Sequence, residues 1–419
     1  MNKITKITLS SLAAILLAGC GSGGSSSDTG YLIDSEVIGV SYSTSSGLTG
    51  TTDIYGRFQY QNGDDVTFSL GNLVLGTTQP NSDGLVTPET LIVGDNSTPT
   101  QAQSASITLM LQTLQSLDDD NITSNGLRIT NEITSRFAHM NQRVYFKDID
   151  ENYLLDLDQN LSLGLDEDGD GLLDINSSAA IAHHERAMKS WQYGSRPDKY
   201  ATGETSSFNL SSYPITQNLT QELKDGLAYM GNEERLAYDL YTNLYNYYFN
   251  NGIVIKQLTN IANNSEIKHI ALVQEMVRRY NITDDQLTDV NSSAPGSSVT
   301  IQQMPTAQYD LESIQNLYDS LYNLGTVDTA SALKVGCMVE VTDINDLNNY
   351  IQKAEEVEAY DIQEGFKVLR AGSYNHYWSF DYGLKRLGYS DGCYFSGDPL
   401  LTNKVDIYPP KESLGRGKR

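Results

Sequence analysis

The chain has 419 residues, of which 39% are hydrophobic, so it is long enough for two or three domains with ordinary cores. Its 53 acidic and 28 basic residues give a formal net charge of −25, which argues against a nucleic-acid partner because phosphates would be repelled. The same charge is compatible with cation binding, and 27 tyrosines beside scarce lysine and arginine are common in exported proteins.

Residues 1–19 have the features of a lipoprotein signal peptide. A short basic start precedes an apolar run, Leu9 to Leu17, that is too short to span a membrane as a mature helix. The sequence Leu17-Ala-Gly-Cys20 resembles a bacterial lipobox, in which Cys20 would be lipidated and become the mature N-terminus. Residues 20–30 would then form a flexible tether. An ordinary signal peptide or an uncleaved anchor is the alternative.

The expected location follows from this motif. The membrane would be a partner through the lipid on Cys20. No aspartate comes directly after Cys20, which by resemblance to Gram-negative lipoproteins favours the outer membrane, with the protein facing the periplasm or the cell surface.

Two cysteines, Cys337 and Cys393, remain once Cys20 is lipidated. Exported proteins with two cysteines often pair them, so we expect a disulfide between these two residues. The alternative is a free thiol at Cys337, which comes three residues before Glu340.

Residues 31–98 predict a small module of β-strands. Short β-branched and aromatic runs alternate with turns rich in glycine, asparagine and serine. The sequence from Gly50 to Tyr60 resembles β-sandwich modules of the carboxypeptidase-regulatory type, in which a Thr-Asp-x-x-Gly turn precedes a Phe-x-Tyr strand. No catalytic set of residues is present here, so a spacer or adhesive module is the favoured interpretation.

Residues 99–193 predict a mostly helical segment with acidic turns. One turn places oxygens at positions 1, 3, 5 and 9 of an EF-hand-like loop, and these belong to Asp166, Asp168, Asp170 and Asp174. The twelfth position is Ser177 instead of the usual glutamate, so either a weak calcium loop or a solvated turn fits. The adjacent His183 and His184 point to different sides of a helix and are not expected to chelate one metal together.

The remainder of the chain predicts a linker, a helical domain and a tail. Residues 194–217 contain two prolines and no helical period, which is typical of a linker. Residues 218–390 have long amphipathic periods. The expected helices cover residues 220–248, 255–280, 307–324, 328–356 and 360–387, with a candidate break near Asp343 to Asp346. Residues 391–419 form the expected tail.

Five side chains with metal-binding chemistry occur at matching heights on these helices. Glu234 lies about 21 Å from the first hairpin turn, and Glu266 with His269 about 18 to 22 Å, at 1.5 Å per residue. Glu340 and His376 lie about 24 and 27 Å from the second hairpin turn. Two hairpins joined by a long crossover form the ferritin-like topology, in which inward glutamates and Glu-x-x-His bind two metal ions.

Residues from about 222 to 385 also resemble a ferritin-like family catalogued as domain of unknown function 2202. The matching stretches are Tyr229-Met-Gly-Asn-Glu-Glu-Arg-Leu-Ala-Tyr-Asp-Leu-Tyr241, Ile261-Ala-Asn-Asn-Ser-Glu-Ile-Lys-His269, Val335-Gly-Cys-Met-Val-Glu340, Asp343-Ile-Asn-Asp-Leu347 and Gly372-Ser-Tyr-Asn-His376. The resemblance covers about two fifths of the chain. It implies a ferritin-like bundle with a metal centre and brings no established reaction.

One departure from the di-iron pattern concerns the last helix. It offers Ser373-x-x-His376 where Glu-x-x-His is usual, so one bridging carboxylate is missing. Asp343, one turn after Glu340, can replace it; otherwise the site is asymmetric or holds a single metal. Tyr241 and Tyr374 are candidates for hydrogen bonds to the ligands or for redox steps.

The sequence therefore predicts a multidomain lipoprotein: a β-sandwich-like module, a mostly helical segment and a C-terminal all-α ferritin-like four-helix bundle. The bundle would bind iron or manganese through Glu234, Glu266, His269, Glu340 and His376, with a metal-dependent oxidoreductase as one outcome and homodimers as another. The alternative is a structural or adhesive surface lipoprotein whose bundle binds no metal. A hydrolase has little support, because Gly-x-Ser-x-Gly and His-Glu-x-x-His are both absent.

Overall fold

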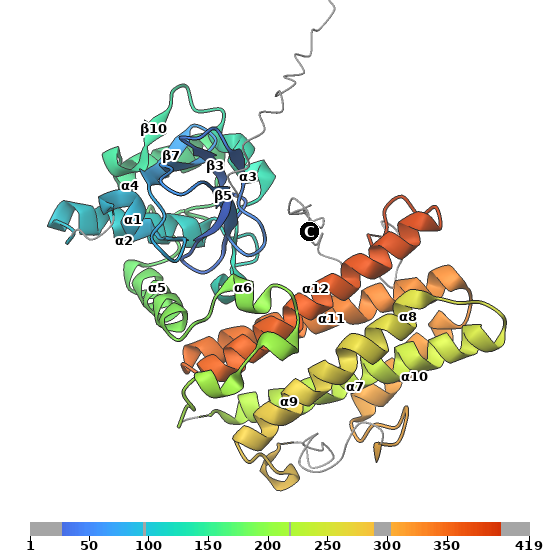
Figure 1. Ribbon diagram of the computed structural model, residues 1–419. Helices are drawn as coiled ribbons and strands as arrows, with labels where there is room; N and C mark the ends of the chain where they lie inside the picture. The colour runs from blue at the N-terminus through green and yellow to red at the C-terminus, as the bar shows by residue number, and fades with distance from the viewer. Residues whose placement is uncertain (1–26, 95–97, 218, 289–302, 395–419) are drawn as a thin grey trace, which may run out of the picture.

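The computed structural model describes residues 27–94, 98–217, 219–288 and 303–394. Cys20, the expected signal peptide and most of the expected tail lie outside these residues. In the described part, a β-rich N-terminal unit (blue to cyan in Figure 1) stands beside a set of long helices (yellow to red). None of the described helices is long and apolar enough to cross a membrane.

Three sheets form the N-terminal unit. The strands are β1 (Asp28–Leu32), β2 (Val37–Ile38), β3 (Ser41–Thr44), β4 (Thr49–Thr51), β5 (Arg57–Tyr60), β6 (Val66–Leu70), β7 (Leu73–Thr78), β8 (Leu85–Val86), β9 (Leu127–Arg128) and β10 (Val144–Tyr145). The strand orders are β5-β1-β8, β10-β7-β6-β3-β4 and β2-β9. β1 begins at Asp28, so the last residues of the expected tether are part of a strand.

Alternating side chains set the register of these strands. In β6, Val66, Phe68 and Leu70 are buried, and the residues between them are half-buried, which is the two-residue period of a strand with one face on the core. Phe58 of β5 meets Phe68 edge to face, with ring centroids 4.9 Å apart. This aromatic contact joins the three-stranded sheet to the five-stranded sheet.

Four helices share the core of these strands, and three of them come after residue 98. They are α1 (Pro88–Val93), α2 (Gln101–Ser116), α3 (Asn131–Phe137) and α4 (Glu151–Leu161). A fifth helix, α5 (Ser177–Gln192), packs on α2. Met110 and Leu114 of α2, Phe137 of α3 and Leu154 of α4 belong to the same buried cluster as Phe68. The boundary expected at residue 98 therefore does not separate two cores, because the strands bury their apolar face against these helices.

The segment expected to be a linker packs against the long helices. Residues 194–217 include a short helix, α6 (Pro197–Tyr200), that contacts the last long helix. Tyr200, Leu210 and Tyr213 are buried in this segment. The segment therefore packs through these large side chains, and its prolines and polar residues prevent a long helix.

The C-terminal helices run side by side (Figure 1). They are α7 (Gln221–Asn250), α8 (Lys256–Ile261), α9 (Ile267–Arg279), α10 (Glu312–Gly325), α11 (Thr329–Glu356) and α12 (Tyr360–Arg386). Between α8 and α9 the chain forms one π-helical turn, η5 (Ala262–Glu266). α11 packs along α12, and α7 packs against α9 and α11. The candidate break near Asp343 does not occur, because Ile344 and Leu347 bury their side chains within an uninterrupted helix.

Charged side chains are buried where α12 meets the N-terminal unit. Lys367 of α12 places its Nζ 3.1 Å from Glu36 Oε1 and 3.8 Å from Glu364 Oε1. The hydroxyl of Tyr200 also donates to Glu36. Burial alone would raise the pKa of Glu36, but the charges of Lys367 and Arg370 and the hydrogen bond from Tyr200 together lower it to about 2. The two parts of the chain are thus joined by a desolvated ion pair.

A second buried pair joins α5 to α11. His183 Nδ1 lies 3.0 Å from Glu355 Oε1, and both side chains are at most 5% exposed. Arg186 also contacts Glu355 at 3.0 Å. His184 instead bonds Asp34 at 2.8 Å, so the two adjacent histidines have separate partners, as expected for neighbours on a helix.

The His183–Glu355 pair should give the protein a measurable pH dependence. Burial would lower the pKa of His183, but the hydrogen bond and charge of Glu355 raise it above 6.5. Because the pKa is higher in the folded than in the unfolded protein, protonated His183 stabilises the fold below pH 6.5. This contribution is about 1.4 kcal/mol for each unit by which the pKa is raised, and it is lost as the pH rises through the pKa of the folded protein. We expect His183→Gln to lower the free energy of unfolding, measured by urea denaturation, more at about pH 6 than at about pH 9. An equal cost at both would mean that His183 is neutral in the folded protein.

Candidate metal centre

Five helical segments, of which η5 and α9 are continuous, bring the five predicted ligands together inside the C-terminal helices. Glu234 comes from α7, Glu266 ends η5, and His269 is one turn later on α9. Glu340 comes from α11 and His376 from α12. The ligand atoms of Glu266, His269 and His376 all lie within 4.8 Å of one another.

Glu266 stands between two glutamate–histidine pairs. In the first pair, His269 Nδ1 lies 3.1 Å from Glu234 Oε2; in the second, His376 Nδ1 lies 3.3 Å from Glu340 Oε2. Glu266 turns Oε2 toward His269 at 3.3 Å and Oε1 toward His376 at 2.9 Å. The imidazole rings are stacked with centroids 5.3 Å apart. One carboxylate therefore faces both halves of the site.

All five side chains are buried, at 1% to 6% exposure. Isolated charges are costly in such an environment, so buried charges are paired or bind metal ions. Several polar atoms here nevertheless have no hydrogen-bond partner, among them Glu234 Oε1, Glu266 Oε1 and His376 Nδ1. The last two atoms lie 2.9 Å apart, at ion-pair distance. Carboxylate and imidazole groups that converge in a buried place fit a shared cation.

Burial and the charges of neighbouring groups shift the pKa values of these side chains. Burial raises the pKa of Glu234 to about 7, with His269 opposing this effect. Burial also raises the pKa of Glu340 against the charge of His376. For His376, burial acts to lower the pKa, but Glu266 and Glu340 raise it to about 9. Without a cation, the two imidazoles must carry the protons that balance these carboxylates.

The π-helical turn aims Glu266 into the interior. A π turn accommodates one more residue than an α turn, and such turns are frequent at functional sites. Glu266 is the last residue of η5 and His269 follows within α9, so both side chains reach the same face. Asn263, Asn264 and Ser265 precede them, and residues of these types are poor helix formers.

Gly372 allows α12 to lie against His269. A Cβ atom at this position would lie 2.4 Å from both Cε1 and Nε2 of the His269 ring. Any side chain would therefore displace the imidazole. The sequence reasoning did not single out this glycine, although it directly precedes the Ser373-x-x-His376 motif.

Asp343 lies beside Ser373, the residue that stands where the di-iron pattern has a bridging glutamate. The hydroxyl of Ser373 donates to Asp343 Oδ2, while Asp343 Oδ1 is buried without a partner. Burial, followed by the charges of Glu234 and nearby Glu233, raises the pKa of Asp343 well above its usual value. Asp343, the predicted replacement, is thus in contact with Ser373, where the usual glutamate is missing.

Tyr241 fixes the orientation of Glu340. Its hydroxyl donates to Glu340 Oε1 at 2.5 Å, and its ring is fully buried against Phe380. Burial and the Glu340 charge raise the pKa of Tyr241 well above its usual value, so the phenol stays protonated. The hydrogen bond leaves Glu340 Oε2 directed to His376.

The match to known proteins covers the part of the chain that holds this site. A family model described as "Uncharacterized protein domain (DUF2202)" matches residues 223–396. Over 179 residues the chain is 32% identical to the uncharacterized protein MJ0754 of Methanocaldococcus jannaschii, covering 43% of this chain and 83% of that protein. The chain belongs to the DUF2202 family. The crystal structure of hypothetical protein MJ0754 from Methanococcus jannaschii aligns with 44% of this chain and 99% of its own, at 27% identity and a TM-score of 0.35.

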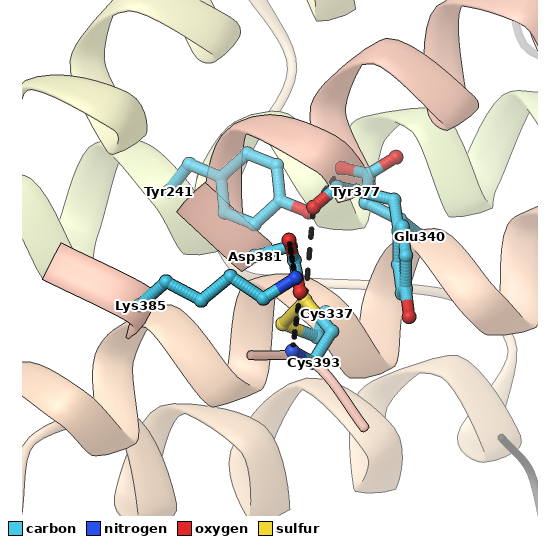
Figure 2. The surroundings of a disulfide bond; sticks show 7 residues. All are labelled: Tyr241, Cys337, Glu340, Tyr377, Asp381, Lys385 and Cys393. Atoms are coloured by element: carbon cyan, nitrogen blue, oxygen red, sulfur yellow. Dashed lines mark hydrogen bonds and ion pairs between the residues drawn. A yellow bond between two sulfur atoms is a disulfide. The ribbon is translucent and has the colours of Figure 1, made fainter. Parts of the chain in front are cut away.

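Every ligand considered above lies inside the DUF2202 domain, from Glu234 to His376. The N-terminal unit lies outside the matched residues. The DUF2202 domain also includes both cysteines, which form a disulfide (Figure 2). Cys337 is one helical turn before Glu340, and Cys393 follows α12. The pairing agrees with the favoured prediction, and Cys337 is not a free thiol in this structure.

Tyr374, the second tyrosine considered, does not face the candidate metal centre. It stacks on Trp378, with ring centroids 5.7 Å apart. The charges that act on its hydroxyl belong to Arg370 and Arg128, followed by Asp120 and Asp119 of the N-terminal unit. Its helical position, two residues before His376, turns it to another face of α12. A role for Tyr374 at the ligands is therefore not supported.

The acidic loop of the N-terminal unit gathers part of the predicted calcium set. Ligand oxygens of Asp166, Asp168 and Asp174 lie within 4.8 Å of one another, and Asp170 is outside this group. Asp170 Oδ1 instead accepts a hydrogen bond from the backbone amide of Leu172 at 2.9 Å. Asp166 accepts from the backbone amides of Asp170 and Gly171, both at 3.0 Å. Calcium binding by this loop stays a prediction.

Proposed function

We propose that the DUF2202 domain is a ferritin-like four-helix bundle that holds a di-metal centre of iron or manganese. The observation that supports it best is the position of Glu266, whose two oxygens face two glutamate–histidine pairs. Bundles of the di-iron and di-manganese class use a bridging glutamate in this way. Carboxylate and imidazole ligands suit both metals.

The side chains present fit such a centre. Glu234 and His269 would hold one ion, Glu340 and His376 the other, and Glu266 would bridge them. Asp343 Oδ1, buried without a partner, would supply the fourth carboxylate. Two divalent ions would compensate the charge that otherwise requires protonated imidazoles and carboxyls.

A redox role is the activity that this centre would support. Iron or manganese with open positions supplies reactivity toward oxygen or peroxide when bound. The protein would contribute a water-poor interior and fixed ligand orientations. Tyr241 would hold Glu340 in place through its 2.5 Å hydrogen bond. By the sequence of its first twenty residues, the protein would carry this bundle as a lipoprotein anchored through Cys20.

Metal analysis of the chain from residue 21 onward tests the proposal. We expect about two iron or manganese ions per chain in the unaltered protein. Glu266→Gln should lose most of both ions because it removes the bridging charge, whereas His376→Ala should lose the ion of the second pair. Metal content by elemental analysis is the readout, with circular dichroism to verify helical folding.

Asp166→Ala is the matched control, because it alters the acidic loop and leaves the bundle unchanged. It should keep both ions. A folded protein without iron or manganese in any variant, and with an unchanged melting temperature on adding either metal, would overturn the proposal. That result would favour the alternative of a structural or adhesive lipoprotein with a metal-free bundle.

A further inference from the structure

Side chains from three distant segments form a hydrogen-bonded chain between the N-terminal unit and α11. Ser35 Oγ lies 3.1 Å from Nε2 of His183, and the other ring nitrogen, Nδ1, lies 3.0 Å from Glu355 Oε1. His183 is 148 positions from Ser35 and 172 from Glu355, so no local motif reveals the set. A hydroxyl, an imidazole and a carboxylate in this order form the arrangement that activates a serine for nucleophilic attack.

Each member of this trio is held in place. Ser35 lies in the tight turn between β1 and β2, and His183 belongs to α5. All three side chains are buried, at 3% to 6% exposure. Glu355 also accepts hydrogen bonds from Arg186 at 3.0 Å and from Gln363 at 3.3 Å. These contacts fix the carboxylate, which in turn orients the imidazole toward the serine.

A small cavity adjoins the serine. Ser35 and Glu355 line it, and it is partly open to solvent. Its volume of about 20 Å³ has room for about one water-sized group, which favours an acetyl group over longer acyl chains. Lys367 also lines this cavity, and its ammonium group can stabilise the negative charge that develops on an acyl oxygen during attack.

We propose that Ser35, His183 and Glu355 form a catalytic site that hydrolyses acetyl esters. The site shares no residue with the candidate metal centre and does not depend on it. Ser35 Oγ forms a bond to the acyl carbon while its proton passes to His183 Nε2. The bond between the acyl carbon and the leaving oxygen then breaks, and His183 returns the proton to the leaving alcohol. Water, activated by the same imidazole, releases acetate and restores the serine.

Hydrolysis of p-nitrophenyl acetate by the chain from residue 21 onward, followed as release of p-nitrophenol, tests this assignment. Ser35→Ala should lose the activity above background. His183→Gln should lower the rate by about a hundredfold or more, because general-base catalysis contributes that much. Mass spectrometry of acid-quenched, digested protein should find an acetyl group on Ser35. The butyrate ester should react more slowly, since the cavity holds only a short acyl chain.

The pH dependence separates catalysis from a structural role of Glu355, which acts as a positioning residue through the imidazole. Only the neutral imidazole accepts the proton of Ser35, so the rate should rise with pH through the pKa of His183. Burial lowers this pKa, whereas Glu355 and Asp34 raise it and Arg186 lowers it. Glu355→Gln should therefore move the midpoint of the rate profile to lower pH. A lower rate with an unmoved midpoint would contradict this role.

Two control variants leave the trio unchanged. His139→Gln alters an exposed histidine, and Ser45→Ala alters another serine of the N-terminal unit. Both should keep the activity, and circular dichroism verifies the fold of every variant. Hydrolysis retained in folded Ser35→Ala, or acetyl groups found only on other residues, would overturn the site. Absence of hydrolysis above background in the unaltered protein would overturn it as well, and would mean that the trio only joins the segments.

Discussion

Replacing Lys367 with methionine is expected to destabilise the protein by about 3–5 kcal/mol, the usual cost of removing one partner from a buried ion pair. Lys367 is 6% exposed and lies 3.1 Å from Glu36, which is itself 2% exposed. Without the ammonium group, Glu36 would stay charged in a desolvated place or become protonated. In the unaltered protein Lys367 is the main group that lowers the pKa of Glu36, to about 2, against the effect of burial. In the variant this pKa would rise. Urea denaturation followed by circular dichroism measures the loss.

Two further variants make this result interpretable. Lys353→Met removes a lysine of α11 whose side chain is 24% exposed and whose partner, Glu222, is 61% exposed. It should cost only about 0–1 kcal/mol, as surface pairs do. The double variant Glu36→Gln with Lys367→Met should be more stable than Lys367→Met alone, because no unpaired charge remains. A single-variant cost as small as that of Lys353→Met would contradict the expectation.

Removal of the disulfide is expected to cost about 4 kcal/mol. Cys337 and Cys393 are separated by 56 residues, and closing a loop of this length restricts the unfolded chain by about that amount. The double variant Cys337→Ala with Cys393→Ala should therefore unfold at a lower urea concentration than the oxidised protein. Adding a reductant should bring the unaltered protein to the same midpoint and leave the variant unchanged.

The disulfide also bears on one half of the candidate centre. Cys337 precedes Glu340 by one turn, and Figure 2 shows Tyr241 and the disulfide around this glutamate. We expect the cysteine double variant to keep the ion of the Glu234–His269 pair more firmly than the ion of the Glu340–His376 pair. The disulfide contributes little to stability if the reductant does not change the unfolding midpoint of the unaltered protein and the double variant unfolds at that same midpoint.

The long helices could be predicted from the sequence because amphipathic periods extend over many turns. α7 and α12 begin and end within two residues of their expected limits. The same regularity brought Glu234, Glu266, His269, Glu340 and His376 together, since a rise of 1.5 Å per residue converts sequence positions into heights. The disulfide could be predicted because two cysteines remain in a protein whose sequence indicates export.

Other features depend on contacts between distant segments and leave little local signal. The Lys367–Glu36 pair joins residues 331 positions apart, and no period or motif connects them. The π turn that ends at Glu266 changes the local geometry, and the poor helix formers within it do not distinguish a π turn from an ordinary weak point in a helix. The strands and α2 share a core that only the folded chain brings together, so the boundary at residue 98 looked plausible from composition alone.

The burial of α12 restricts how this chain can vary. Fourteen consecutive residues, 360–373, are buried although they form a single helix, so this stretch has no face turned to solvent. Most helices accept substitutions on an outer face, which lets sequences diverge while the fold persists. In residues 360–373 each replacement meets either the neighbouring helices or the N-terminal unit, and polar residues such as Arg370 have fixed partners there. Neutral change in this stretch would therefore require paired replacements on both sides of the contact, and the N-terminal unit and α12 would evolve together.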